Sequence, residues 1–312
     1  MSGLELRAPR ADEAVAVADV LTAAGETSGL GRVEPEEVTL WLSSPTYDIE
    51  GNFRVAVRDG KLVGYCDLVP EGEKDVYVWM DLRVPPGDAE VEPALVDWAL
   101  ARVAELSEGH AGRVAIRTGG YGNDPARAPL LHDRGFAVVR HSFRMLLDFE
   151  GEPENPVWPE GIELEPFERG RNDREAFDAF QEAFRDAWGF VPYPFEEWEH
   201  DQLEAHDFDP SLNFVARDGG DLAGVAFCRA KSATHPGYGW VDILGVRRPW
   251  RKRGLGEALL RHAFRELHAR GLKGVGLGVD AESLTGATRL YERVGMRVVS
   301  RGDTYELEVR SG

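Results

Sequence analysis

Apolar residues in the C-terminal half of the chain change from strand-like to helix-like spacing. Residues 238–246 form a mostly apolar run with the length of a buried strand. Apolar residues then recur three and four positions apart up to Gly271, which predicts a helix; they are Leu255, Ala258, Leu259, Ala263 and Leu267. The order of these segments predicts a strand followed by a helix.

The order of predicted elements occurs twice along the chain. Phe53-Arg-Val-Ala-Val-Arg-Asp-Gly matches Phe214-Val-Ala-Arg-Asp-Gly, and Gly135 of Arg-Gly-Phe matches Gly295 of Val-Gly-Met, 160 residues later. Between the copies, residues 150–161 are rich in Pro, Gly and acidic residues and show no periodicity, which predicts a linker. We therefore expect two tandem domains, residues 1–150 and 151–312.

Composition narrows the class of protein. The chain has 312 residues and a formal charge of −19, which argues against nucleic acid or an anionic membrane as the main partner. No apolar run approaches the roughly 20 residues needed to span a bilayer, and no signal peptide is evident, so a cytoplasmic protein is expected. Cys66 and Cys228 lie in apolar segments of different halves, which predicts two buried thiols rather than a disulfide.

A basic, glycine-containing turn follows the strand at residues 238–246. Arg251, Lys252 and Arg253 precede Gly254 and Gly256 at the start of the predicted helix. Glycine lets a ligand approach the backbone closely, and the free N–H groups of a helix start attract anions. The turn lacks both the P-loop pattern and the Gly-x-Gly-x-x-Gly dinucleotide pattern. The sequence therefore predicts a phosphate-binding turn of another kind, the alternative being an exposed helix start that is basic for no functional reason.

Two motifs resemble the GNAT N-acetyltransferase superfamily. Arg251-x-x-Gly254-x-Gly256 resembles the loop that binds the pyrophosphate of acyl-CoA in that family. Residues 278–296, which end in Leu-Tyr291-x-x-x-Gly295-Met, resemble its next strand and helix. The resemblance implies two α/β domains, each a mixed, mostly antiparallel sheet flanked by helices.

The resemblance also implies the cosubstrate and the residues that bind it. Acetyl-CoA is expected, with no metal, in a gap between the strands at residues 238–246 and 274–279. The implied binding residues are Leu244, Gly245, Val246, Arg251, Lys252, Arg253, Gly254, Leu255, Gly256, Glu257 and Ser283. The family often has Asn where this chain has Ser283; a serine hydroxyl also forms hydrogen bonds but with shorter reach.

Catalytic roles follow from the same resemblance. Tyr291 is implied as the acid that protonates the leaving thiolate, the alternative being a core aromatic, and the Val246 N–H is implied to polarise the thioester carbonyl. Asp242 is a candidate base or substrate anchor, because a carboxylate in an apolar strand is costly unless it has a role. Strand alternation predicts that it projects to the side of Leu244 and Val246. The alternatives are a structural hydrogen bond for Asp242, and His235 or His262 as weaker candidate bases.

Acceptor recognition is expected from residues 186–200 together with the central strand. Trp188, Phe190, Glu196 and Trp240 are the predicted substrate-binding residues, with Tyr193 and Trp198 among the other aromatics of the segment. Aromatic side chains beside carboxylates suit a cationic or sugar-like amine. The alternative is a helix pair that packs its aromatics on the sheet.

The first copy lacks the basic turn. Its corresponding segment, residues 84–93, contains no Arg or Lys and carries Asp88, Glu90 and Glu92 where pyrophosphate would bind. Asn123 and Leu131 stand where the second copy has Ser283 and Tyr291. We therefore expect the first copy to be a degenerate domain that acts as a scaffold.

The expected activity is acetyl transfer from acetyl-CoA to the primary amine of a small molecule by direct attack. Tandem copies and total length also resemble the mycothiol synthases, tandem members of the family that acetylate an amino-sugar-linked cysteine. A non-catalytic module that responds to acyl-CoA is the alternative from another class. The sequence does not specify the acceptor, and it leaves monomer and homodimer open.

Overall fold

The computed structural model describes residues 3–120, 126–283 and 285–310. The chain forms two compact units. The first unit comprises Met1–His141 and Gly302–Gly312, and the second comprises Ser142–Arg301. Each unit is a mixed, mostly antiparallel sheet with helices on both faces, which confirms the predicted fold class.

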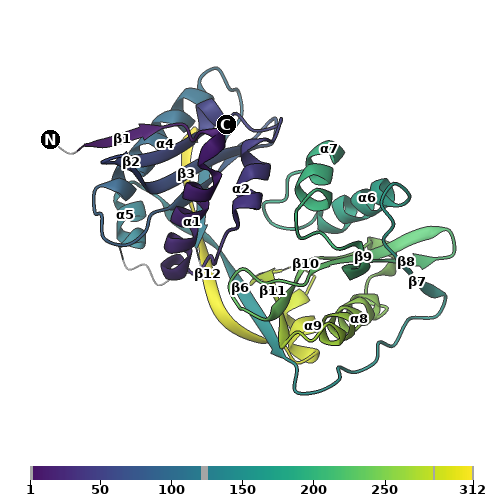
Figure 1. Cartoon of the computed structure of the whole chain (residues 1–312). Helices are drawn as coiled ribbons and strands as arrows, with labels where there is room; N and C mark the ends of the chain where they lie inside the picture. Colours follow the sequence, from purple (N-terminus) through teal and green to yellow (C-terminus); the bar gives the residue numbers. More distant parts are fainter. Residues whose placement is uncertain (1–2, 121–125, 284, 311–312) are drawn as a thin grey trace. The chain divides into compact units, whose positions relative to one another are not determined.

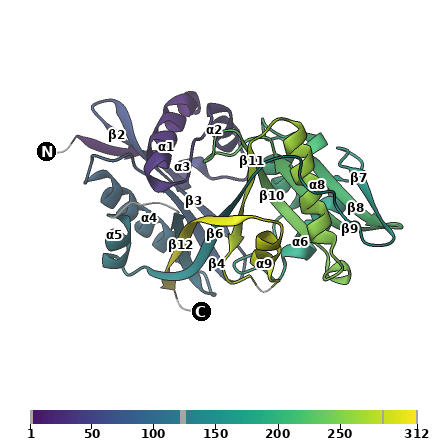
Figure 2. The ribbon, with the colours of Figure 1, turned by 90° about the horizontal axis from the view of Figure 1, so that it is seen from below.

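The first unit contains a sheet with the strand order β1-β2-β3-β4-β5-β12, in which only β4 and β5 run parallel. In Figure 2, α1, α2 and α3 lie on one side of its strands and α4 and α5 on the other. The elements are β1 (Leu4–Arg7), η1 (Ala11–Glu13), α1 (Ala14–Ser28), α2 (Pro35–Leu42), α3 (Ile49–Asn52), β2 (Phe53–Arg58), β3 (Lys61–Glu71), β4 (Val76–Arg83), α4 (Val91–Ser107), β5 (Val114–Gly120) and α5 (Arg127–Asp133).

The second unit has the strand order β6-β11-β10-β9-β8-β7, with β10 and β11 parallel. The remaining elements along the chain are β6 (Ala137–Asp148), β7 (Ile162–Pro166), α6 (Asp173–Phe184), α7 (Phe195–Trp198), the π-helix η2 (Glu199–Leu203), η3 (Pro210–Leu212), β8 (Asn213–Asp218), β9 (Asp221–Arg229), β10 (Tyr238–Val246), η4 (Arg248–Trp250), α8 (Leu255–Ala269), β11 (Gly274–Asp280), α9 (Ala287–Arg293) and β12 (Arg297–Arg310).

The last strand of each sheet comes from the other half of the sequence. Asp303 to Arg310 of β12 pair with β5 in the first unit, and Ser142 to Asp148 of β6 pair with β11 in the second. The chain therefore leaves the first unit inside β6, between His141 and Ser142, and returns inside β12, between Arg301 and Gly302. Residues 150–161, the predicted linker, belong to the second unit. Because the two halves repeat the same order of elements, either last strand has the pattern needed to complete either sheet.

Two apolar clusters enclose the sheet of the second unit. On the face covered by α8 and α9, here called the α8 face, Leu259, Phe264 and Leu277 belong to the buried core. On the opposite face, here called the α6 face, Phe177, Trp198 and Ile243 belong to a separate cluster. Figure 1 shows α8 and α9 on one side of these strands and α6 and α7 on the other.

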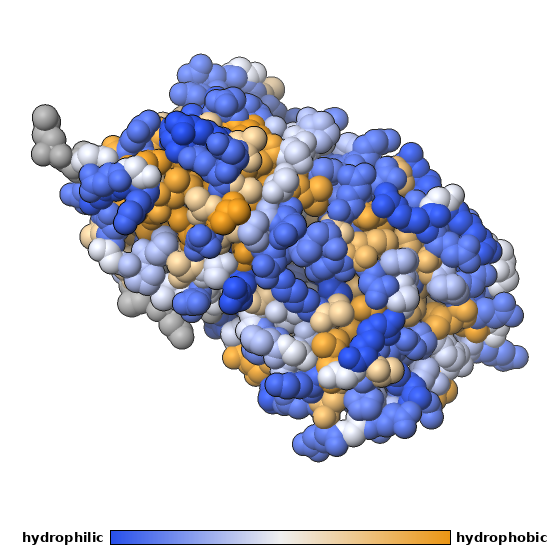
Figure 3. All heavy atoms as spheres, viewed as in Figure 1, coloured by the Kyte–Doolittle hydropathy of each residue, from blue (hydrophilic) through white to orange (hydrophobic). Residues whose placement is uncertain are grey.

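Both cysteines are buried free thiols, Cys66 in the first unit and Cys228 in the second, as predicted. On the face drawn in Figure 3, polar side chains predominate and apolar ones form separate patches. Among the described residues, no helix has the length and apolar character required to cross a membrane.

Candidate active site

The basic turn ends in a group of backbone N–H donors. Lys252 and Gly254 have positive φ angles of 61° and 90°, and Gly254 is the N-cap of α8. In the part of the chain that the structure describes, the N–H groups of residues 252–257 have no acceptor. Left-handed residues in a turn and a helix start both direct such donors to one side. The turn can therefore bind an anion such as pyrophosphate through its backbone.

The Arg251 side chain is held by the fold. Its Nε donates to the Val246 carbonyl at 3.1 Å, its Nη2 donates to the Ala183 carbonyl at 2.9 Å, and its Nη1 lies 3.3 Å from Asp186. Arg248 and then Arg251 lower the pKa of Asp186 by hydrogen bonding. Arg251 thus fixes the turn to the end of β10 and to α6, and its charge adds to the positive potential there.

The neighbouring charged residues divide into tethered and exposed ones. Arg253 bonds Asp218 at 3.2 Å and the Glu160 carbonyl at 3.3 Å. The Glu257 carboxylate accepts a hydrogen bond from Nε of Arg261 at 3.0 Å. Glu257 therefore contributes to the turn only through its backbone N–H, which is one of the free donors of residues 252–257. Lys252 is exposed and has no ion-pair partner among the described residues. Lys252 is therefore the side chain of this turn best placed to meet a phosphate.

β10 and β11 separate beside this turn. Their parallel pairing extends from Tyr238 and Gly274 to Val241 and Leu277, so residues 242–246 have no partner strand on that side. The resulting gap agrees with the splayed strands that the resemblance implied.

Backbone groups of β10 face this gap. Arg247 donates to the Ala223 carbonyl at 3.0 Å, which makes these two residues a hydrogen-bonded pair of the antiparallel ladder with β9. Such pairs alternate with pairs whose backbone groups point away. Leu244 and Val246 are at the alternate positions, so their N–H and C=O groups face the gap. An extended ligand can pair with them as an added strand does.

Gly245 and Leu255 support this geometry from behind. A Cβ on Gly245 would come within 3.2 Å of the Ala183 Cβ, so this glycine lets α6 approach the strand. Leu255 is buried, with 1% of its surface exposed, and anchors the first turn of α8 in the core. A Cβ on Gly256 would meet Leu290 at 3.4 Å, which is a tight but ordinary contact.

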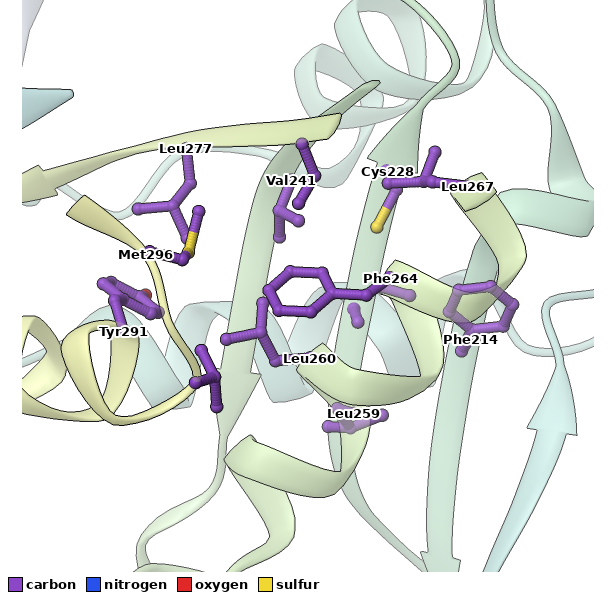
Figure 4. Packing of buried hydrophobic residues seen from close by; sticks show 14 of the residues in the cluster. Phe214, Cys228, Val241, Leu259, Leu260, Phe264, Leu267, Leu277, Tyr291 and Met296 are labelled. Carbon is purple, nitrogen blue, oxygen red and sulfur yellow. The ribbon is translucent and has the colours of Figure 1, made fainter. Parts of the chain in front are cut away.

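Tyr291 lies at one end of the α8-face cluster. In Figure 4 it is beside Met296 and Leu277, at the end opposite Phe214. Only 8% of its surface is exposed, and burial raises the pKa of its hydroxyl to about 12. Among the described residues the hydroxyl has no hydrogen-bond partner, and it is not fully enclosed. It therefore remains protonated at neutral pH and can donate its proton.

Asp242 occupies a β-bulge. The register of β10 and β9 pairs Val241 with Cys228 and Ile243 with Phe227, so Asp242 is the extra residue between them. The bulge interrupts the alternation of side chains. The expectation that Asp242 projects to the side of Leu244 and Val246 is therefore wrong.

The carboxylate of Asp242 instead pairs with Arg229. Nε of Arg229 donates to its Oδ2 at 2.6 Å. Arg229 follows Cys228, which lies on the α8 face, so alternation places Arg229 on the α6 face. Burial raises the pKa of Asp242, although Arg229 opposes that effect. A carboxylate with a raised pKa suits a general base better than an ordinary one.

The two histidines have structural surroundings. The His262 ring packs edge-on to Phe214 with centroids 4.5 Å apart, and burial lowers its pKa. His235 lies in the loop before β10, where its Nδ1 is 2.8 Å from the Thr234 hydroxyl, and burial lowers its pKa too. His235 thus precedes the paired end of β10, whereas the unpaired residues 242–246 are at its other end.

The predicted acceptor segment divides into core and surface. Trp198 is fully buried and belongs to the α6-face cluster, and Tyr193 packs against that cluster, as the alternative interpretation of the aromatics required. Phe190 is half-buried against Phe180 and Phe184. Trp188, 36% exposed, and Glu196 are the surface members, which leaves them accessible to an acceptor.

Trp240 has a partner that sequence reasoning missed. It lies across from Gly276 in the pairing of β10 and β11, and a Cβ on Gly276 would come within 2.5 Å of its ring. Gly274 makes room for Tyr238 in the same way. The spacing Gly274-x-Gly276-x-Gly278 is the signal that could have revealed a strand face without side chains.

Gly278 lies one step past the last paired residues and is exposed. Ser283 is half-buried, and its hydroxyl is 2.9 Å from that of Thr285. Asn123, its counterpart in the first copy, lies outside the described residues.

The corresponding turn of the first unit is acidic. Arg58 forms ion pairs with Asp88 at 3.0 Å and Glu90 at 2.9 Å, and Arg127 pairs with Glu92 at 2.8 Å. The carboxylate of Asp88 accepts the N–H of Glu90 at 3.1 Å. Carboxylates therefore already occupy the positions that an anionic ligand would need.

Within residues 3–120, 126–283 and 285–310, no three His, Cys, Asp or Glu side chains are arranged to hold a metal ion.

Comparison with known proteins places this geometry in a family. Residues 174–296 match the model of the acetyltransferase (GNAT) family. A mycothiol acetyltransferase from Thermobispora bispora is 32% identical over 225 residues, which cover 70% of this chain and 75% of that protein.

Two solved structures are similar to this chain over nearly its whole length. A GCN5-related N-acetyltransferase from Sphaerobacter thermophilus has a TM-score of 0.75 and 30% identity, and the match covers 99% of this chain and 96% of that one. A tandem GNAT protein from the clavulanic acid biosynthesis pathway has a TM-score of 0.71 and 16% identity, with 99% of each chain covered. The second likeness concerns the fold alone.

Proposed function

The chain belongs to the acetyltransferase (GNAT) family and is an acyltransferase with a tandem architecture, and from this premise we propose that its second unit transfers an acetyl group from acetyl-CoA to a primary amine of a small molecule. The observation that carries the proposal is the group of free N–H donors at residues 252–257, beside the open edge of β10. That combination fits a pyrophosphate joined to an extended arm.

The residues present fit acetyl-CoA in three places. The N–H donors and Lys252 would hold the pyrophosphate, the backbone of Leu244 and Val246 would pair with the arm, and Ser283 would offer it a hydroxyl. When bound, acetyl-CoA supplies an acetyl group activated as a thioester.

Three groups of the protein would then handle the protons and charge. Asp242 takes a proton from the acceptor ammonium and passes it to solvent, which leaves a neutral amine. The Val246 N–H donates a hydrogen bond to the acetyl carbonyl as negative charge develops on it. Tyr291 gives its proton to the sulfur.

The bonds and protons balance. A bond forms between the amine nitrogen and the acetyl carbon, and the carbon–sulfur bond breaks. The second proton lost by the nitrogen restores the Tyr291 hydroxyl, and one proton is released to solvent overall.

The acceptor is proposed as a small cationic amine, with Trp188, Phe190, Glu196 and Trp240 as the residues that select it. The mycothiol-type reaction on an amino-sugar-linked cysteine is the second candidate, favoured by the relative that is 32% identical. The first unit is proposed as a degenerate scaffold, because its turn carries Asp88 and Glu90.

Calorimetric titration with acetyl-CoA tests the cosubstrate and the number of sites together. We expect one molecule bound per chain, followed by release of free CoA thiol when an accepted amine is added. The amine panel should include an amino-sugar-linked cysteine, free amino sugars and polyamines. Two bound molecules would contradict the role given to the first unit, and no binding would contradict the proposal itself.

A further inference from the structure

Arg229 is shared between two carboxylates on the α6 face of the second unit. Its Nε donates to Oδ2 of Asp242 at 2.6 Å, and its Nη1 donates to Oδ1 of Asp207. The three side chains are 25%, 24% and 21% exposed in the order Arg229, Asp242 and Asp207. They form one partly buried charge group, here called the Asp207–Arg229–Asp242 group.

The group joins two parts of the site that are distant in the sequence. Asp242 is the bulged residue of β10, where the strand leaves β11. Asp207 lies between η2 and η3, just after the predicted acceptor segment. Arg229, at the end of β9, therefore links the candidate base to the loop that follows the acceptor segment.

The hydrogen bonding leaves one oxygen of the base available. Oδ2 of Asp242 is engaged by Arg229, whereas Oδ1 has no partner among the residues that the structure describes. The Asp242 side chain is 24% exposed. A donor can therefore reach Oδ1 without displacing Arg229.

The Asp207–Arg229–Asp242 group has a net negative formal charge. Two carboxylates and one guanidinium sum to one negative charge, and burying an unbalanced charge is costly. A ligand with one positive charge would balance the group.

We propose that Arg229 is a positioning residue that divides its charge between Asp207 and Asp242, so that the site receives its acceptor amine as an ammonium ion whose proton passes to Oδ1 of Asp242. This inference rests on the proposed function. One N–H bond of the ammonium breaks, one O–H bond forms on Asp242, and the nitrogen keeps the electron pair with which it attacks the acetyl carbon.

Burial, Arg229 and Asp207 act on the pKa of Asp242 in different directions. Burial raises it, Arg229 on β9 lowers it, and Asp207 raises it. Burial alone lowers the pKa of Arg229, but the two carboxylates together raise it. On the other face, burial and then the Asp242 charge raise the pKa of the Cys228 thiol, which stays protonated.

Carbon-13 NMR of protein labelled at the aspartate carboxyl carbon tests the proposal without a known acceptor. The Asp242 signal is assigned by its loss in Asp242→Asn, and its titration midpoint is then measured in the wild type, Asp207→Asn, Arg229→Gln and Arg229→Lys. We expect the midpoint to move to lower pH in Asp207→Asn and to higher pH in Arg229→Gln, with a smaller change in Arg229→Lys. Methylammonium chloride should lower the wild-type midpoint more than the same concentration of sodium chloride.

The outcomes separate the proposal from its premise. If the Asp242 midpoint moves in the same direction in Asp207→Asn and Arg229→Gln, or does not move, the proposal that Arg229 shares its charge between the two carboxylates is wrong. If the two salts change the midpoint equally, the proposal that the site binds an ammonium ion is wrong. If Arg229→Gln does not fold, the midpoints of Asp207→Asn and Arg229→Lys still test whether Arg229 shares its charge between Asp207 and Asp242. Opposite shifts together with full acetyl transfer by Asp242→Asn would leave the group intact and refute only the role of Asp242 as base.

Discussion

The guanidinium of Arg251 donates a hydrogen bond to the carbonyl of Val246, at 3.1 Å, across the turn that separates β10 from α8. This bond joins the basic turn to the end of β10. The Arg251 guanidinium, which the sequence suggested for ligand binding, thus also holds the N–H donors of residues 252–257 in place.

Replacing Arg251 should therefore affect both folding and binding. Arg251→Lys keeps the charge but loses the bonds to the Val246 and Ala183 carbonyls, and we expect a loss of about 1–3 kcal/mol in the free energy of unfolding. Acetyl-CoA affinity should fall as well. Denaturant unfolding and calorimetry measure the two effects. Arg253→Lys, at a more exposed ion pair, is the control and should change stability by less than about 1 kcal/mol; equal losses in both variants would contradict this role.

Gly254 should be required for its positive φ angle of 90°. Gly254→Ala would meet no neighbouring atom within 4 Å but would place a side chain in the left-handed region, which costs roughly 1–2 kcal/mol. Relaxation of this strain would turn the N–H donors away, so we expect acetyl-CoA binding to weaken about tenfold or more. Gly271→Ala is a matched control, because Gly271 has a φ of 77° and equally open surroundings at the other end of α8. It should lose similar stability and keep its affinity.

Tyr291→Phe should separate chemistry from structure. The hydroxyl has no described partner, so its removal should change the free energy of unfolding by less than about 1 kcal/mol. Loss of the proton donor should lower kcat about 100-fold or more, with little change in the KM for acetyl-CoA. Because burial raises the pKa of Tyr291 to about 12, this acid should not limit the rate between pH 6 and 9 in the wild type. Steady-state kinetics across that range would test the assignment, and an unchanged kcat would refute it.

Asp67 should make the stability of the first unit depend on pH. Burial and the facing Asp81 raise its pKa to about 7 from 3.8, although the Tyr65 hydroxyl, 2.8 Å away, opposes the shift. Between these values the folded state binds more protons than the unfolded state, so stability falls as pH rises. Asp67→Asn should flatten the decrease in Tm from pH 4 to 8 and raise Tm at pH 8. Asp19→Asn, at an exposed position, is the control for the change in net charge.

Particular residues show how far the sequence could lead. The strand at residues 238–246, the helix after Gly254 and the buried thiols were predictable, because each depends on local spacing of apolar residues. Asp242 could be selected as a costly carboxylate, but its direction could not. A β-bulge arises from the register between two strands, and a single strand does not encode that register alone.

The exchange of last strands between the units shows the same limit. β6 and β12 have equivalent patterns, so the sequence specifies that each sheet needs such a strand without specifying which half supplies it. Likewise, Arg229 and Asp207 became recognisable only when folding brought them to Asp242. The sequence by itself determined the strand and helix of residues 238–269, the family and the basic, glycine-containing turn, because these are local patterns of side chains and glycines. Tertiary structure decided the strand exchange, the bulge and the charge group, because each depends on pairing between distant segments.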